Sequence, residues 1–236
     1  MEAWGRIARW KRWVLIGVAI LLVAVVGGPF AYIHLVEGKA PPPLTLASPS
    51  TGSTGSSGPS SATTPDGTWK ITTGSVVGYR VNEVLFGQSN VAVGRTGSIT
   101  GSIAVAGTTI TAGTITVDMT TLTSDQSRRD EQFNGRIMQT ATYPTATLLL
   151  RDPVALGSIP AVGAERSLQI TGTLTLHGVT KTVAFSVAGR YQGSTFSVAG
   201  SIPITFSDWN IQNPSFGPVT TEAHGTLEFS LVFAHA

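Results

Sequence analysis

The sequence contains no cysteine, and only 12% of its 236 residues are charged. Without a thiol the chain forms no disulfide, thiolate metal site or catalytic cysteine, and it offers no cysteine for lipoprotein acylation. The charged fraction is about half that of an ordinary soluble domain. Glycine, threonine, serine and valine are frequent instead, and this composition favours strands and turns over helices.

The basic residues are distributed unevenly along the chain. Arg6, Arg9, Lys11 and Arg12 lie in the first dozen residues, whereas from Gly67 to the C-terminus ten basic residues are balanced by ten acidic ones. A domain without net charge has no electrostatic footprint for DNA or RNA. We therefore expect no nucleic-acid partner.

Residues 13–33 form one uncharged apolar run, "WVLIGVAILLVAVVGGPFAYI". About 20 such residues span the hydrocarbon core of a bilayer as a helix. The basic residues 1–12 precede this run, so the positive-inside rule predicts a cytoplasmic tail, a single transmembrane helix at 13–33, and an extracytoplasmic remainder held at the cell membrane.

A cleaved signal peptide is the alternative interpretation of the N-terminus, with an apolar core from Val14 to Val26. The small-residue pattern of a cleavage site is poor, because Phe30, Tyr32 and His34 crowd the region. Both interpretations export the rest of the chain.

Residues 34–66 are dominated by proline, serine, threonine and glycine, and Leu44 and Leu46 are the sizeable apolar residues of the stretch from 37 to 66. Such a composition buries too little apolar surface to offset the entropy lost on ordering. We expect a disordered, flexible linker between the helix and the domain that follows.

The stretch 67–236 alternates apolar and polar residues with the period of a strand. The pattern predicts that Leu174, Phe185, Val198 and Phe229 point inward, together with the small residues Gly172 and Gly200, which we expect to leave interior space. Glycine-containing turns separate the runs, as in "LHGVTK" at 176–181. Short antiparallel strands joined by such turns indicate an all-β sandwich or barrel.

The polar stretch 124–144 breaks the alternation and predicts a helix capped by Ser124. Phe133, Ile137 and Met138 share one face of this helix and are placed to close one end of an apolar interior. The charged residues 128–131 at its start fit either local ion pairs or a polar gate at a pocket mouth.

No arrangement of residues indicates catalysis or metal binding. The four histidines lack the spacings of metal sites, and no nucleophile elbow of the form G-x-S-x-G is present. We expect no catalytic group, no metal and no cofactor. The aromatic residues Phe185, Phe196, Trp209 and Phe216 are equally compatible with core packing and with a pocket wall.

Four motifs carry a resemblance to a known family: "GTWKI" at 67–71, "TVDMTTLTSDQSRRDEQF" at 116–133, "YPTATL" at 143–148 and "GTLTLHGVTKTVAF" at 172–185. Together they make essentially all of 67–236 resemble the YceI-like family of bacterial lipid-binding proteins. The resemblance implies an eight-stranded antiparallel barrel of lipocalin type that holds a polyisoprenoid chain.

The expected protein is thus a membrane-tethered, all-β, lipocalin-like barrel with a helical insertion that binds a polyisoprenoid, an isoprenoid quinone or another long apolar lipid. The residues expected to contact this lipid are Phe133, Ile137, Met138, Phe185, Phe196, Val198, Trp209 and Phe229. An interaction module with a filled barrel is the main alternative, and an enzyme acting on isoprenoids is a further one. The sequence does not indicate the oligomeric state.

Overall fold

The computed structural model describes residues 3–28, 40–46, 65–85, 87–158, 161–217 and 219–236. At the N-terminus, α1 (Ala3–Leu22) continues into a π-helical turn, Val23–Gly27. Residues 29–33 of the predicted transmembrane helix lie outside the described residues. Within the described ranges, no helix combines the length and the apolarity needed to cross a membrane.

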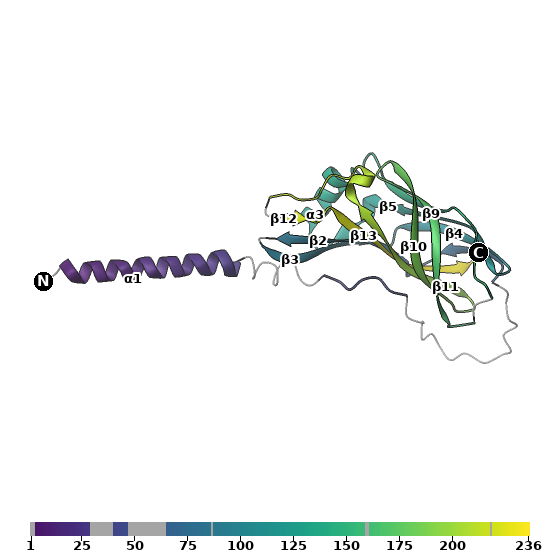
Figure 1. Ribbon diagram of the computed structural model, residues 1–236, viewed down its shortest axis with the longest axis horizontal. Coiled ribbons are helices and arrows are strands. Elements are labelled where there is room, and N and C mark those ends of the chain that lie inside the picture. The colour runs from purple at the N-terminus through teal and green to yellow at the C-terminus, as the bar shows by residue number, and fades with distance from the viewer. Residues whose placement is uncertain (1–2, 29–39, 47–64, 86, 159–160, 218) are drawn as a thin grey trace.

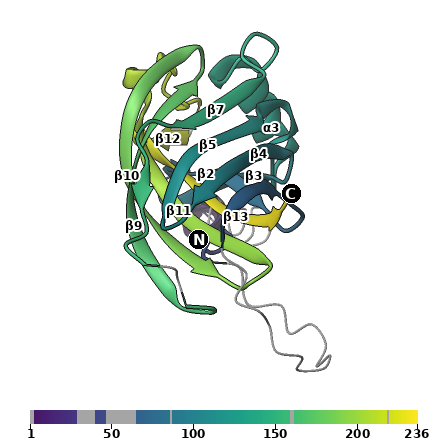
Figure 2. The ribbon, with the colours of Figure 1, turned by 90° about the vertical axis from the view of Figure 1, so that its right-hand side faces the viewer.

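Eight antiparallel strands form a closed barrel (Figures 1 and 2). Strand β1 pairs with β4 on one side and with β13 on the other, and these two pairings close the ring. The predicted all-β antiparallel barrel of eight strands is therefore confirmed. In their order around the ring the strands are β1 (Gly67–Ile71), β4 (Ile99–Ala106), β5 (Thr109–Asp118), β7 (Thr145–Leu150), β9 (Glu165–Leu176), β10 (Val179–Tyr191), β11 (Thr195–Thr205) and β13 (His224–His235).

Strand β13 has two partners along one of its edges. Its C-terminal part pairs with β1, from Trp69↔His235 to Ile71↔Phe233. Its N-terminal part pairs with β2 (Val76–Leu85), from Val76↔Ser230 to Arg80↔Thr226. The barrel is therefore closed by β1 at one end, whereas β2 takes the place of β1 at the other.

The sheet beyond β2 continues away from the ring. Strand β2 pairs with β3 (Gln88–Thr96), and β3 pairs with the short β6 (Thr123–Ser124) rather than with β4. The remaining short strands are β8 (Val154–Ala155), which pairs with β5, and β12 (Val219–Thr221), which pairs with β2.

The four large residues predicted to point inward belong to the core or pack against it. Leu231 and Phe233 are only 2% exposed, and Leu174 and Phe229 are also buried. Val198 is half-buried and packs against the same core. The backbone pairings set the register of the barrel wall, with Phe229 opposite Gly200 on one side and opposite Val77 on the other.

The predicted helix is shorter than the stretch that suggested it. It comprises α3 (Ser127–Gln132) and a π-helical segment, Phe133–Ile137, and its N-cap is Gln126 rather than Ser124. Ser124 belongs to β6, and both its backbone N–H and its hydroxyl donate to Asp130 Oδ1, at 2.8 and 2.7 Å. The cap prediction was wrong because Ser124 is already engaged in strand pairing.

The linker contains one segment with a defined position. Residues 40–46 lie against the outer surface of the barrel, where Leu44 and Leu46 are half-buried. Pro65 lies directly before β1, and its carbonyl accepts a hydrogen bond from Trp69 Nε1 at 2.8 Å. Residues 34–39 and 47–64 of the predicted linker lie outside the described residues.

The closed end of the barrel provides a test of this packing. Replacing Phe233, at 2% exposure, with alanine is expected to lower the free energy of unfolding by about 3–5 kcal/mol, because a large core side chain is lost. Ser167 on β9 is exposed, and its replacement with alanine should change stability by less than about 0.5 kcal/mol. Chemical denaturation of the full chain in mild detergent measures both values, and equal losses would contradict the assigned register.

Candidate functional site

The interior of the barrel contains a cavity of about 760 Å³, which lies toward the end where β2 replaces β1. Its volume falls within the range of small-molecule binding sites. Apolar side chains from six strands form most of its wall. They are Val77, Val81 and Leu85 of β2, Ile115 and Val117 of β5, Ala146 and Leu148 of β7, Leu174 and Leu176 of β9, Ile202 and Ile204 of β11, and Leu227, Phe229 and Leu231 of β13.

Aromatic side chains fill the opposite end of the barrel. Trp69 is 1% exposed and makes edge-to-face contacts with Phe196, at 4.5 Å between ring centroids, and with Tyr191, at 6.0 Å. None of these three residues lines the cavity. This aromatic floor thus fills the barrel beyond one end of the cavity, and the helical insertion lies at the other end.

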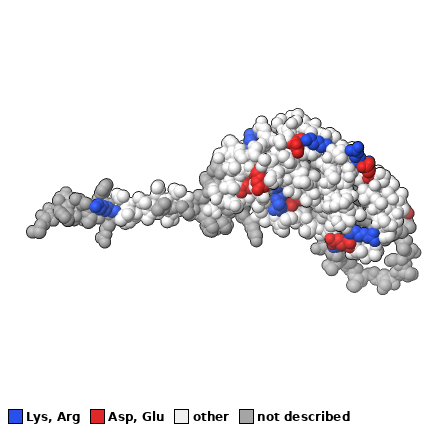
Figure 3. Space-filling model, in the orientation of Figure 1, with Lys and Arg blue, Asp and Glu red and all other residues white. Residues whose placement is uncertain are grey.

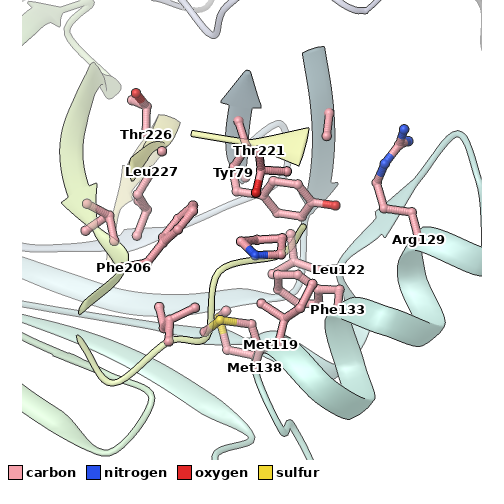
Figure 4. A pocket seen from close by; sticks show the side chains of 18 of the residues that line it. Tyr79, Met119, Leu122, Arg129, Phe133, Met138, Phe206, Thr221, Thr226 and Leu227 are labelled. Atoms are coloured by element: carbon pink, nitrogen blue, oxygen red, sulfur yellow. The ribbon is translucent and has the colours of Figure 1, made fainter. Parts of the chain in front are cut away.

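The helical insertion closes the side of the cavity where the strands separate. Phe133 stacks on Tyr79 of β2, with the rings 5.0 Å apart and inclined by 13°. Ile137 and Met138 also line the cavity. Met119 and Leu122, in the segment that follows β5, line it next to them. Figure 4 shows Phe133, Met138, Met119 and Leu122 close to one another at the cavity.

Most charged groups at the rim of the cavity are paired with one another. Arg129 Nη2 lies 3.2 Å from Glu83 Oε1, and Arg129 also pairs with Asp125. Glu83 additionally accepts a hydrogen bond from Asn90 Nδ2 at 2.8 Å. Arg129 therefore joins α3 to β2, and the local ion pairs considered for this sequence are present.

Two polar groups at the rim remain available. Arg128 lines the cavity and is exposed, and it makes no ion pair within the described part of the chain. The hydroxyl of Tyr79 likewise has no hydrogen-bond partner among the described residues. Burial raises the pKa of Tyr79 above its usual range, against an opposing effect of Arg129, so the phenol is neutral and able to donate a hydrogen bond.

The eight residues predicted to contact a ligand fall into two groups. Phe133, Ile137, Met138 and Phe229 line the cavity, whereas Phe185, Phe196, Val198 and Trp209 do not. Phe185 packs edge-to-face on Phe229 at 6.0 Å, Phe196 belongs to the aromatic floor, and Trp209 is buried beside the β9–β10 turn, where its carbonyl lies 3.1 Å from His177 Nδ1. The alternation of apolar and polar residues identifies the side chains that point inward. It does not indicate where along the barrel axis each side chain lies, and this position decides whether it lines the cavity.

The expected role of the interior glycines was wrong. A Cβ on Gly200 would lie 2.8 Å from Phe229 Cζ and 2.9 Å from the Ser186 carbonyl oxygen, and one on Gly172 would lie 2.9 Å from Leu148 Cδ1. Neither glycine lines the cavity. Their missing side chains allow close packing of neighbours, and the open volume comes instead from the divergence of β2 from β1.

Several residues of the wall were not identified as site residues from the sequence. Tyr79, Val117 and Met119 line the cavity, and only the fold places them beside the helix. Phe206 follows β11 in a single helical turn, Phe206–Trp209, and had no periodic signal.

A metal site and a charged binding surface each require a particular arrangement of side chains. Within the ranges that the structure describes, no group of three or more histidine, aspartate or glutamate side chains is arranged to hold a metal ion. On the face shown in Figure 3 most of the surface is uncharged, and acidic and basic side chains lie close to one another rather than forming a field of one sign.

The YceI-like domain model matches residues 69–233, which is most of the chain. The chain therefore belongs to the YceI-like family. No curated protein matches the chain.

Solved structures share the fold with this chain, among them the following two. A polyisoprenoid binding domain from Saccharophagus degradans, implicated in plant cell wall breakdown, is 17% identical, with a TM-score of 0.58 over 72% of this chain and 98% of that one. BcnA from Burkholderia cenocepacia is 20% identical, with a TM-score of 0.50 over 65% of this chain and 95% of that one.

A substitution that fills the cavity tests its accessibility. Ala146 is 4% exposed and faces the cavity from β7, so Ala146→Phe should occupy part of the volume while the barrel stays folded. Binding of an apolar fluorescent probe should then weaken at least fivefold, as measured by fluorescence titration. Gly200→Leu is the contrasting variant: it overpacks the core and should lower stability by about 1–3 kcal/mol. Unchanged probe affinity in a folded Ala146→Phe protein would place the binding site elsewhere.

Proposed function

We propose that the barrel binds one long apolar lipid of the polyisoprenoid class, with its chain inside the cavity. The observation that carries this proposal is the apolar cavity itself, which lies within the barrel and opens toward one end. Each methylene transferred from water into such a wall contributes about 0.8 kcal/mol. The description of the Saccharophagus degradans domain as polyisoprenoid binding supports the same ligand class.

The distribution of polar groups supports a ligand with one polar end. The strands of the wall contribute almost only apolar side chains, whereas Glu83, Gln126, Arg128 and Arg129 lie at the rim. A chain that enters from the rim leaves its hydroxyl, phosphate or quinone group near the Tyr79 hydroxyl and Arg128. Binding therefore needs no charge in the interior, where an isolated ion would be costly.

The proposed protein is tethered to the membrane and faces away from the cytoplasm. Residues 13–33 are uncharged and follow a basic segment, as in a single-pass anchor with its N-terminus in the cytoplasm. In the described part of this region, Trp13, Leu15, Ile20, Leu21 and Val23 are each more than 60% exposed, which suits contact with lipid. The barrel then binds its ligand next to the bilayer.

Binding rather than catalysis is the function that the site supports. Of the charged side chains that line the cavity, Glu83 and Arg129 are paired with each other, and the exposed Arg128 has no acidic partner among the described residues with which to form a catalytic pair. The alternative of a filled, ligand-free barrel is not favoured, because the cavity is large and apolar.

The direct test is extraction of the purified full-length protein with organic solvent, followed by mass spectrometry. We expect about one long isoprenoid chain per protein, and a clear reduction in Ala146→Phe. Ala184→Phe makes the same change at an exposed position of β10 that does not line the cavity, so it serves as the matched control and should retain the lipid. Protein that carries no lipid when isolated from its own membrane would refute the proposal.

The polar end of the ligand can be tested with Tyr79→Phe. This change keeps the stacking on Phe133 and removes the hydroxyl, so affinity for a polyprenol should fall about two- to tenfold, as for the loss of one hydrogen bond. Affinity for squalene, an isoprenoid hydrocarbon with no polar end, should not change. Calorimetric titration with both ligands measures the difference, and equal losses would show that the hydroxyl does not contact the polar end.

A further inference from the structure

Three charged side chains meet on the outer surface of the barrel, across neighbouring strands. Glu228 of β13 lies between Arg80 of β2, at 3.2 Å from its Nε, and Arg95 of β3, at 2.8 Å from its Nη2. Glu228 points away from the cavity, yet it is only 3% exposed. Gly78 lies beneath Arg95, and a Cβ there would come within 2.8 Å of Arg95 Cγ. The arginine reaches Glu228 because this position has no side chain.

The proline-rich residues 40–46 cover this cluster. Arg80 Nη2 donates a hydrogen bond to the Pro41 carbonyl oxygen at 2.8 Å, and Arg95 Nη2 donates to the Pro42 carbonyl oxygen. The backbone N–H of Leu44 donates to Glu228 Oε2 at 3.3 Å. The cluster thereby joins residues that are between 39 and 184 positions apart in the sequence.

The segment and the cluster are chemically complementary. Two guanidinium groups face one carboxylate, so donors remain that the carboxylate does not satisfy. Proline has a carbonyl oxygen and no N–H, so three consecutive prolines offer acceptors only. The next residue, Leu44, supplies the N–H that Glu228 accepts. Because proline also restricts the free chain, the segment loses less entropy on docking than a glycine-serine stretch would.

Only a few residues of sequence separate the docked segment from the proposed anchor. Gly28, at the end of the described N-terminal helix, lines the cavity, and eleven residues separate it from Ala40. Twelve backbone steps reach at most about 40 Å, whereas the 37 steps from Gly28 to Pro65 would reach about 120 Å. Figure 1 shows α1 extending from the end of the barrel that carries β12 and α3, which is the end of the cavity rim.

We propose that residues 40–46 form a strap that binds the Arg80–Glu228–Arg95 surface of the same chain and keeps the cavity rim next to the membrane. This inference rests on the proposed membrane anchor. With the strap docked, residues 34–39 alone join the anchor to the strap, and residues 47–64 add nothing to the length of this tether. The lipid then passes between bilayer and cavity over a short, fixed distance.

The test exploits the lack of cysteine in the chain. A fluorescent donor on Ser89→Cys, exposed next to the β2–β3 turn, reports its distance from acceptor lipids when the full-length protein is reconstituted in liposomes. A Gly-Ser insert of about thirty residues after residue 34 raises the root-mean-square span of the tether from roughly 13 to 33 Å, and energy transfer should fall. The same insert after residue 55 is the matched control and should leave transfer unchanged.

Removing the strap should abolish the difference between the effects of the two inserts on energy transfer. In Arg80→Ala/Arg95→Ala, transfer should fall without any insert, and the insert after residue 55 should lower it further. A second variant, with Pro41, Pro42 and Pro43 changed to glycine, leaves the barrel surface intact and should act in the same direction. An equal response of the wild-type chain to the two inserts would overturn the proposal.

The outcome is separable from that of the lipid-binding proposal. Energy transfer does not require lipid in the cavity, so an empty barrel would still show whether the strap is docked. Conversely, lipid that co-purifies with a protein whose two inserts act equally would leave the binding function standing and refute the strap.

Discussion

The backbone pairing of β13 is the constraint on which the rest of the domain depends. One edge of this strand is shared, with β1 bound to its C-terminal part and β2 to its N-terminal part. At each position along this edge, the backbone of β13 pairs with one neighbouring strand only. The ring is therefore closed through β1 and β4 at one end of the barrel and not at the other. At the other end β2 leads to β3 and β6, and the wall must be completed by the helical insertion.

This asymmetry separates a packed region from a hollow one within a single barrel. Where β1 closes the ring, Trp69, Tyr191 and Phe196 fill the interior. Where β2 diverges, Phe133 and Tyr79 stack across the gap without filling it, and a cavity of about 760 Å³ remains. An eight-stranded barrel is at the size limit between filled and ligand-holding interiors, so the divergence of one strand decides between the two.

The sequence indicated the strands, their inward faces and the helix, because each has a local period. It placed Phe133, Ile137 and Met138 on one face, and these residues do line the cavity. It did not separate Phe229, which lines the cavity, from Phe185, which does not, because that difference depends on position along the barrel axis. The docking of residues 40–46 was equally beyond a local pattern, because its partners Arg80, Arg95 and Glu228 lie 39 to 184 residues further along the chain.

The central claim is that the space left by the divergence of β2 from β1 is the place of an apolar chain. A crystal structure of the protein, purified from its own membrane without delipidation, tests this claim most directly. The account predicts continuous density for one extended chain that runs from Leu231 past Phe133 to the rim at Arg128, with a polar end near the Tyr79 hydroxyl. A cavity filled by repacked side chains, or a lipid bound only to the outer surface, would contradict it.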